Sequence, residues 1–128
     1  MSFPTPLNIT IMKRVLIIDD ELDICLLLQA YLKRNGLSAQ YACDLEEGTA
    51  KLFRIPPDIL ILDNNLPDGY GLERIEFFKQ EFPEIKLIMI SAMSGIRQVA
   101  LENGADYFLK KPFSLDRIKE VLNFQQAA

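Results

Sequence analysis

Five polar residues stand where apolar runs of the sequence end. Asp19 and Asp20 follow one run, Asp63 a second, Ser91 a third, and Lys111 comes shortly after a fourth. Carboxylates held close together repel one another, so their pKa values rise unless a cation joins them. Mg²⁺ is the fitting cation because it prefers oxygen ligands and keeps several waters, which leaves room for a phosphoryl oxygen.

These residue types fit the transfer of a phosphoryl group to a carboxylate. An aspartate such as Asp63 can act as the nucleophile toward phosphorus. The transition state spreads negative charge over the phosphoryl oxygens, so positioned cations are the main catalytic requirement. Lys111 can supply one such cation, and Ser91 can donate a hydrogen bond to a phosphoryl oxygen.

The apolar runs alternate with stretches that have helical signals. Each run is short and lacks a polar–apolar alternation, which is typical of strands covered on both faces. Asp44 with Glu47 predicts a capping box at the start of one helix, and Ser114 caps the last. The predicted strands are 14–18, 37–43, 58–62, 85–90 and 107–109, and the predicted helices are 22–34, 44–53, 71–82, 95–103 and a last one after Ser114.

Five strands alternating with five helices predict an α/β fold. The expected architecture is a doubly wound (βα)5 three-layer sandwich with a five-stranded parallel sheet, of the flavodoxin or CheY-like kind. In such folds the working site lies at the carboxyl ends of the strands. The polar residues that follow the strands are therefore expected to converge.

Size and composition limit the function further. A chain of 128 residues is expected to form one domain, and its net charge of -4 argues against direct nucleic-acid binding. No apolar run is long enough for a membrane span, and no export signal is visible, so we expect a cytoplasmic protein without a membrane partner. Cys25 and Cys43 read as free thiols of a reducing compartment. The chain has no histidine, so any phosphohistidine must come from another protein or another chain.

Four motifs in order resemble the receiver domain of bacterial two-component response regulators, the CheY-like family. Each motif alone is weak, but together they span nearly the whole chain after Met12 and each lies at the end of a predicted strand. They are Val15-Leu16-Ile17-Ile18-Asp19-Asp20-Glu21, Asp63-Asn64-Asn65-Leu66-Pro67-Asp68-Gly69-Tyr70-Gly71, Ile90-Ser91-Ala92 and Phe108-Leu109-Lys110-Lys111-Pro112-Phe113.

The resemblance assigns a role to each polar residue. Asp63 would be the phosphoacceptor, and Asp19, Asp20, Asp63 and the backbone carbonyl of Asn65 would hold Mg²⁺. Lys111, rather than Lys110, matches the lysine that contacts the phosphoryl group.

The resemblance also implies a conformational switch. Ser91 and Phe108 would be the switch residues, with Ser91 moving toward the phosphoryl group and Phe108 turning inward. The Lys111–Pro112 peptide would be cis, and the small Ala92 would leave an entry path for the donor. The segment from Ser91 to Lys111 is shorter than expected for the family, which puts the shape of the output face in doubt.

Expected boundaries and partners follow from the same resemblance. Residues 1–12 would be an N-terminal extension and residues 13–126 the receiver domain. The partners would be a sensor histidine kinase or histidine phosphotransfer protein, a downstream protein target and, in one variant, a second copy bound through helix 95–103, strand 107–109 and the last helix. The protein would not be a conventional enzyme, but it would catalyse its own phosphorylation from phosphohistidine and its own dephosphorylation.

Two other functions compete with this one. A receiver-like module could signal by protein contact without phosphorylation, although the acids, serine and lysine are all present. A flavodoxin-like cofactor binder is disfavoured because acids after the first strand would repel a phosphate without a metal.

The helix at 22–34 is apolar nearly all round, which indicates either extra core packing or a docking surface. Its core stripe is expected to be Leu22, Cys25, Leu26 and Leu32. The docking hypothesis expects Leu28 or Tyr31 to be partly exposed.

Overall fold

The computed structural model describes residues 12–122. The predicted extension falls on residues 1–12, of which 1–11 lie outside the described residues, as do 123–126 of the predicted domain. None of the helices in the described part of the chain is long and apolar enough to cross a membrane.

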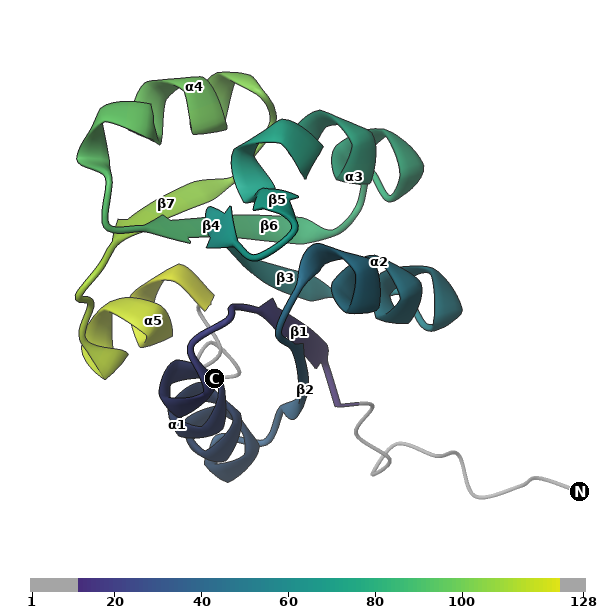
Figure 1. Ribbon diagram of the computed structural model, residues 1–128. Coiled ribbons are helices and arrows are strands. Elements are labelled where there is room, and N and C mark those ends of the chain that lie inside the picture. Colours follow the sequence, from purple (N-terminus) through teal and green to yellow (C-terminus); the bar gives the residue numbers. More distant parts are fainter. Residues whose placement is uncertain (1–11, 123–128) are drawn as a thin grey trace, which may run out of the picture.

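The centre of the molecule is a five-stranded parallel sheet (Figure 1). Its spatial order is β2-β1-β3-β6-β7, so the chain starts in an inner strand and winds outward in both directions. This arrangement confirms the predicted doubly wound fold. The strands are β1 (Arg14–Ile18), β2 (Ser38–Ala42), β3 (Ile59–Asp63), β6 (Lys86–Ser91) and β7 (Tyr107–Lys110).

Helices cover both faces of the sheet, which makes three layers (Figure 1). On one face lie α1 (Leu22–Arg34) and α5 (Leu115–Leu122). On the other lie α2 (Leu45–Arg54), α3 (Ile75–Glu81) and α4 (Arg97–Glu102).

The two faces of β1 show why its sequence has no polar alternation. Val15 and Ile17 pack toward α1 and α5, whereas Leu16 and Ile18 pack toward the helices of the other face. A strand buried on both faces is apolar at every position, as the sequence predicted.

Two predicted helices start differently from expectation. A 3-10 helix, η2 (Gly71–Arg74), precedes α3, and another, η3 (Ser94–Ile96), precedes the six-residue α4. Between β3 and η2 the predicted loop contains a two-stranded antiparallel hairpin of β4 (Asn65–Leu66) and β5 (Gly69–Tyr70).

The start of α2 confirms its predicted cap and departs from it in one detail. The Asp44 carboxylate accepts the backbone N–H of Glu47 at 2.7 Å. The Glu47 carboxylate in turn accepts the N–H of Cys43 at 3.2 Å, one residue earlier than a capping box requires.

The core stripe predicted for α1 is wrong in phase. Leu22 and Leu26 are 49% and 46% exposed, while Cys25, Leu28 and Leu32 are buried. The expectation that Leu28 or Tyr31 is partly exposed holds through Tyr31, which is half-buried, whereas Leu28 is buried. The docking hypothesis keeps its motivation because α1 presents three exposed leucines, counting Leu27.

Candidate functional site

Three carboxylates meet at the carboxyl ends of β1 and β3, two neighbouring inner strands. Asp63 ends β3, and Asp19 and Asp20 follow the neighbouring β1, where Ile18 pairs with Leu62. One oxygen from each acid lies within 4.8 Å of the others. Asp19 and Asp63 are buried and Asp20 is exposed, so the cluster opens to solvent on one side.

Lys111 directly follows the edge strand β7, and its side-chain ammonium lies beside these acids. Its Nζ lies 3.0 Å from Asp19 Oδ2 and 3.3 Å from Asp63 Oδ1. The backbone anchors it, because the Lys111 N–H donates to the Ser91 carbonyl at 2.8 Å. The Lys111–Pro112 peptide is cis, as expected. We call Asp19, Asp20, Asp63 and Lys111 the acid–lysine cluster.

Burial dominates the electrostatics of the cluster. Desolvation, with the nearby charge of Asp19, raises the pKa of Asp63 to about 6 against the pull of Lys111. Desolvation likewise raises the pKa of Asp19. For Lys111, burial acts to lower the pKa, but the neighbouring carboxylates of Glu21 and Asp19 outweigh it and hold that pKa above its ordinary value. Burial thus makes both buried carboxyl groups harder to ionise than exposed ones, even with Lys111 beside them.

The donor set fits a hard divalent cation. Asp19 Oδ2 is fully buried and has no hydrogen-bond partner among the described residues, although the Lys111 ammonium lies nearby. A buried polar atom without a partner is costly, and a metal ligand position would satisfy it. The set consists of carboxylate oxygens, which Mg²⁺ prefers. Asn65 lies two residues after Asp63, at the start of the hairpin.

The loop after Asp63 is held closely over the site. Asn64 is buried, and its side-chain oxygen accepts the N–H of Leu72 while its carbonyl accepts that of Gly71. A Cβ at Gly71 would overlap the carbonyl oxygen of Asp63. Asp68 ties the loop to α2, because its carboxylate accepts the N–H groups of Leu45 and Glu46 at 2.8 and 2.9 Å.

The two predicted switch residues lie on neighbouring strands. Ser91 ends β6, is buried, and accepts the N–H of Met93 on its hydroxyl oxygen at 2.9 Å. That bond leaves the hydroxyl proton available to donate. Phe108 in β7 pairs with Met89 and is buried among α3 and α4 residues, so it occupies an inward position. Ala92 is exposed beside Ser91, at the rim of the site.

Sequence reasoning missed one residue of the site. Glu21 accepts a hydrogen bond from Lys111 Nζ at 2.6 Å, the shortest contact that this ammonium makes. The sequence pattern placed Glu21 only in an acidic helix start. Its partner lies 90 residues away, so no local signal could have identified the contact.

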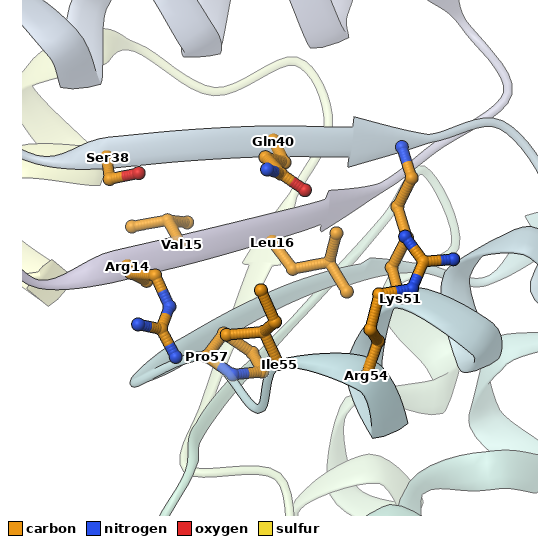
Figure 2. Close-up of a pocket in the computed structure, with 9 residues that line it drawn as sticks. All are labelled: Arg14, Val15, Leu16, Ser38, Gln40, Lys51, Arg54, Ile55 and Pro57. Carbon is orange, nitrogen blue, oxygen red and sulfur yellow. The ribbon is translucent and has the colours of Figure 1, made fainter.

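A second charged region lies at the opposite end of the sheet. Figure 2 shows a hollow beside the start of β2, and we call it the β2 hollow. Three of its lining residues are cations and none is an acid; the lining is Arg14, Val15, Leu16, Ser38, Gln40, Lys51, Arg54, Ile55 and Pro57. Two of the cations bind backbone carbonyls, Arg14 that of Pro56 and Lys51 that of Tyr41.

Comparison with known proteins gives one consistent family. The model of the response regulator receiver domain matches residues 15–123. The response regulator protein PilR of Pseudomonas aeruginosa is 37% identical over 86% of the chain, which covers 25% of PilR. The chemotaxis protein CheY of Thermotoga maritima is 33% identical over 87% of the chain and 95% of CheY.

Solved structures agree with the sequence comparisons. The response regulator TrrA of Thermotoga maritima, determined with Mg²⁺ and BeF, superposes with a TM-score of 0.80 at 33% identity, covering 88% of this chain and 97% of that one. The chain spans about a quarter to a half of the length of the first curated relatives that it matches.

Proposed function

The chain belongs to the response regulator receiver family, whose members accept a phosphoryl group and partner with histidine kinases, and on that premise we propose that Asp63 is the phosphoacceptor. The observation that carries the proposal is the position of Asp63: buried at a strand end, 3.3 Å from the Lys111 ammonium and grouped with two further acids. A carboxylate with a cation beside it and an open side can be approached by an anionic donor.

The proposed reaction is a displacement at phosphorus. An oxygen of the Asp63 carboxylate forms a bond to the phosphorus atom of a donor phosphohistidine, and the P–N bond breaks, leaving the imidazole on the donor. The 128-residue sequence has no histidine, so the donor phosphohistidine lies outside it. Water later cleaves the aspartyl phosphate to aspartate and inorganic phosphate. Lys111 and Ser91 serve the reaction by binding the phosphoryl oxygens.

We further propose that the cluster holds Mg²⁺. The carboxylates of Asp19, Asp20 and Asp63 and the backbone carbonyl of Asn65 would be its protein ligands. Asp19 Oδ2 supports this assignment, because it is buried and accepts no hydrogen bond, although the Lys111 ammonium lies 3.0 Å away. When bound, the ion would neutralise the phosphoryl oxygens and the acids together.

Phosphorylation is proposed to alter the surface around Ser91 and Phe108. Ser91 can turn its hydroxyl from Met93 toward the phosphoryl group, because one backbone bond holds it. Phe108 lies on the next strand and lines a surface hollow with Arg97, Lys110 and Arg117. A downstream protein that binds this hollow would respond to the position of the ring.

Intact mass spectrometry after incubation with acetyl phosphate tests the proposal. With Mg²⁺, the wild type should gain the mass of one phosphoryl group, and Asp63→Asn should gain none. Labelling of both proteins would place the phosphoryl group elsewhere. Labelling of neither, with the cluster intact, would favour a receiver-like module that signals by contact alone.

The proposed docking site for the histidine kinase or phosphotransfer protein is an apolar groove next to Lys111. We call it the docking groove; its lining is Glu21, Ile24, Leu27, Leu28, Ala92, Lys111, Pro112 and Phe113. Leu27 is 53% exposed, and Leu22 and Leu26 extend the apolar surface along α1. An amphipathic helix of the donor could lay its apolar face there.

Leu27→Asp tests the groove. It should abolish transfer from autophosphorylated histidine kinases that label the wild type, while labelling by acetyl phosphate stays unchanged. Phe77→Asp changes an apolar residue on α3 that is 43% exposed; it is the matched control and should leave both reactions unchanged. Equal losses in the two variants would argue against the groove.

The receiver unit is proposed to span residues 13–126 and to work in the cytoplasm. A homodimer could form through α4, β7 and α5, a face on which Val99 and Tyr107 are exposed. Sedimentation with and without beryllofluoride would test that dimer, and a monomer under both conditions would remove it.

A further inference from the structure

Glu21 is the closest partner of the proposed catalytic lysine. Its Oε1 lies 2.6 Å from Lys111 Nζ, against 3.0 Å for Asp19 and 3.3 Å for Asp63. It is also the only one of the three whose contact meets the geometry of a hydrogen bond. Charge-assisted bonds of this length are the strong ones. The ammonium is therefore drawn toward the outer rim of the cluster.

The three acids around Lys111 differ in how readily they can release it. An ammonium has three N–H donors, and three acids surround this one. The Asp19 side chain is fully buried and that of Asp63 is 5% exposed, whereas the Glu21 side chain is 57% exposed. Glu21 can turn into water when it loses the lysine, but Asp19 cannot. A phosphoryl oxygen that needs a donor from Lys111 therefore displaces Glu21 most easily.

We propose that Glu21 is a positioning residue that restrains Lys111 until a phosphoryl group takes its place. The inference rests on the proposed function, since it concerns the lysine of that reaction. Glu21 lines the docking groove together with Lys111, so a docked donor reaches it directly. A small donor such as acetyl phosphate does not fill the groove, so the contact between Glu21 and Lys111 is still intact when it arrives.

The alternative is that Glu21 has only a structural role and supplies negative charge at the start of α1. Asp23 provides the comparison, because it is an exposed acid in the first turn of the same helix with no ion pair among the described residues. Glu21→Gln and Asp23→Asn each remove one charge at this helix end while keeping the side chain's size. General electrostatics or helix-dipole effects would act on both variants.

The first experiment measures the initial rate of phosphoryl incorporation from acetyl phosphate with Mg²⁺. Glu21→Gln should label about two- to five-fold faster than the wild type, the range that a partly exposed ion pair supplies. Asp23→Asn should label at the wild-type rate. An unchanged or lower rate in Glu21→Gln, or equal gains in both variants, would overturn the proposal.

The second experiment reads the contact without any phosphorylation. The Lys111 ammonium resonance is assigned in ¹⁵N–¹H spectra by its loss in Lys111→Gln. It should shift in Glu21→Gln and stay in place in Asp23→Asn. If the chemical shift of the Lys111 ammonium is unchanged in Glu21→Gln, Glu21 does not restrain the lysine. Failure of the wild type to take up a phosphoryl group would instead count against the proposed function, and the spectra would still decide the role of Glu21.

Discussion

The two ends of β1 both carry charged side chains, but the charges have different partners. At the carboxyl end, the acid–lysine cluster sets buried charge against buried charge, and one oxygen of Asp19 has no hydrogen bond. At the amino end, Arg14 of the β2 hollow directs its charge at the Pro56 carbonyl. Lys51, farther along the same hollow, binds the Tyr41 carbonyl and pairs with the Glu47 carboxylate at 3.3 Å. Charge that is buried and incompletely satisfied indicates a site that awaits a ligand, whereas charge that ends on backbone carbonyls or in a partly exposed ion pair indicates structure.

The cations of the β2 hollow have a structural purpose that is visible in the sheet. β2 is an edge strand, and its outward carbonyls would be free to pair with another chain. Lys51 Nζ donates to the Tyr41 carbonyl at 2.7 Å, and Gln29 Nε2 donates to the Ala39 carbonyl at 2.9 Å. The two side chains reach the edge from α2 and α1, so both layers help to close it.

Replacing the lysine at each end should give the largest difference in phosphorylation rate between the two regions. Lys111→Met should lower the rate of phosphoryl incorporation by about 100- to 1,000-fold, the cost of losing one positioned transition-state donor. Lys51→Met should leave that rate unchanged. The measurement is the rate of phosphoryl incorporation from acetyl phosphate with Mg²⁺. Similar losses of rate in both variants would mean that the lysines act only through folding.

The pH dependence of stability distinguishes the cluster next. The folded pKa of Asp63 is about 6, above its ordinary value of 3.8. Its contribution to the free energy of unfolding is therefore full below pH 4 and is lost as the pH rises through about 6. Asp63→Asn should escape this loss, which is about 3 kcal/mol.

Denaturant unfolding of both proteins without metal, from pH 4 to pH 8, measures the difference. The advantage of the variant should grow up to about pH 6 and then level off. A constant difference across this range would contradict the raised pKa of Asp63.

Magnesium should stabilise only through the cluster. An ion that binds the folded state at 100 times its Kd adds about 2.7 kcal/mol to the free energy of unfolding. Asp20→Ala should lose most of this gain, while Arg54→Gln, in the β2 hollow, should keep it. Thermal unfolding with and without Mg²⁺ measures the effect, and an equal gain in Asp20→Ala would place the ion elsewhere.

The smallest expected effect belongs to the β2 hollow. Lys51→Met removes the bond to the Tyr41 carbonyl and should cost about 1 kcal/mol of unfolding free energy. Gln29→Leu removes the corresponding bond of Ala39 from the other layer and should cost a similar amount. Denaturant unfolding of each variant checks this, and a change in either protein's phosphorylation rate would weaken the contrast between the two ends.

Most of the fold could be predicted because strands buried on both faces leave a plain signal. The run Ile59–Leu62 is apolar at every position, and the acid that follows it marks the site. The phase of α1 could not be predicted, since its apolar residues surround the helix and only the packing of β1, β2 and α5 selects Cys25, Leu28 and Leu32.

The site was predictable where a residue follows a strand and unpredictable where two distant segments meet. The convergence of Asp19, Asp63 and Lys111 follows from the parallel sheet. The bond of Lys111 to Glu21 joins side chains that are 90 residues apart in the sequence. The bonds from Leu45 and Glu46 to Asp68 depend on how the β4–β5 hairpin packs against the start of α2. The roles given to Ser91, Phe108 and Asn65 stay predictions.

The most direct test of the central claim locates the phosphoryl group within the chain. The wild type is labelled with acetyl phosphate and Mg²⁺, reduced with borohydride, which converts an aspartyl phosphate to homoserine, and digested for peptide sequencing by mass spectrometry. Homoserine is expected at position 63, with unchanged aspartate at 19 and 20. Homoserine at either of those positions, with Asp63 intact, would contradict the central claim.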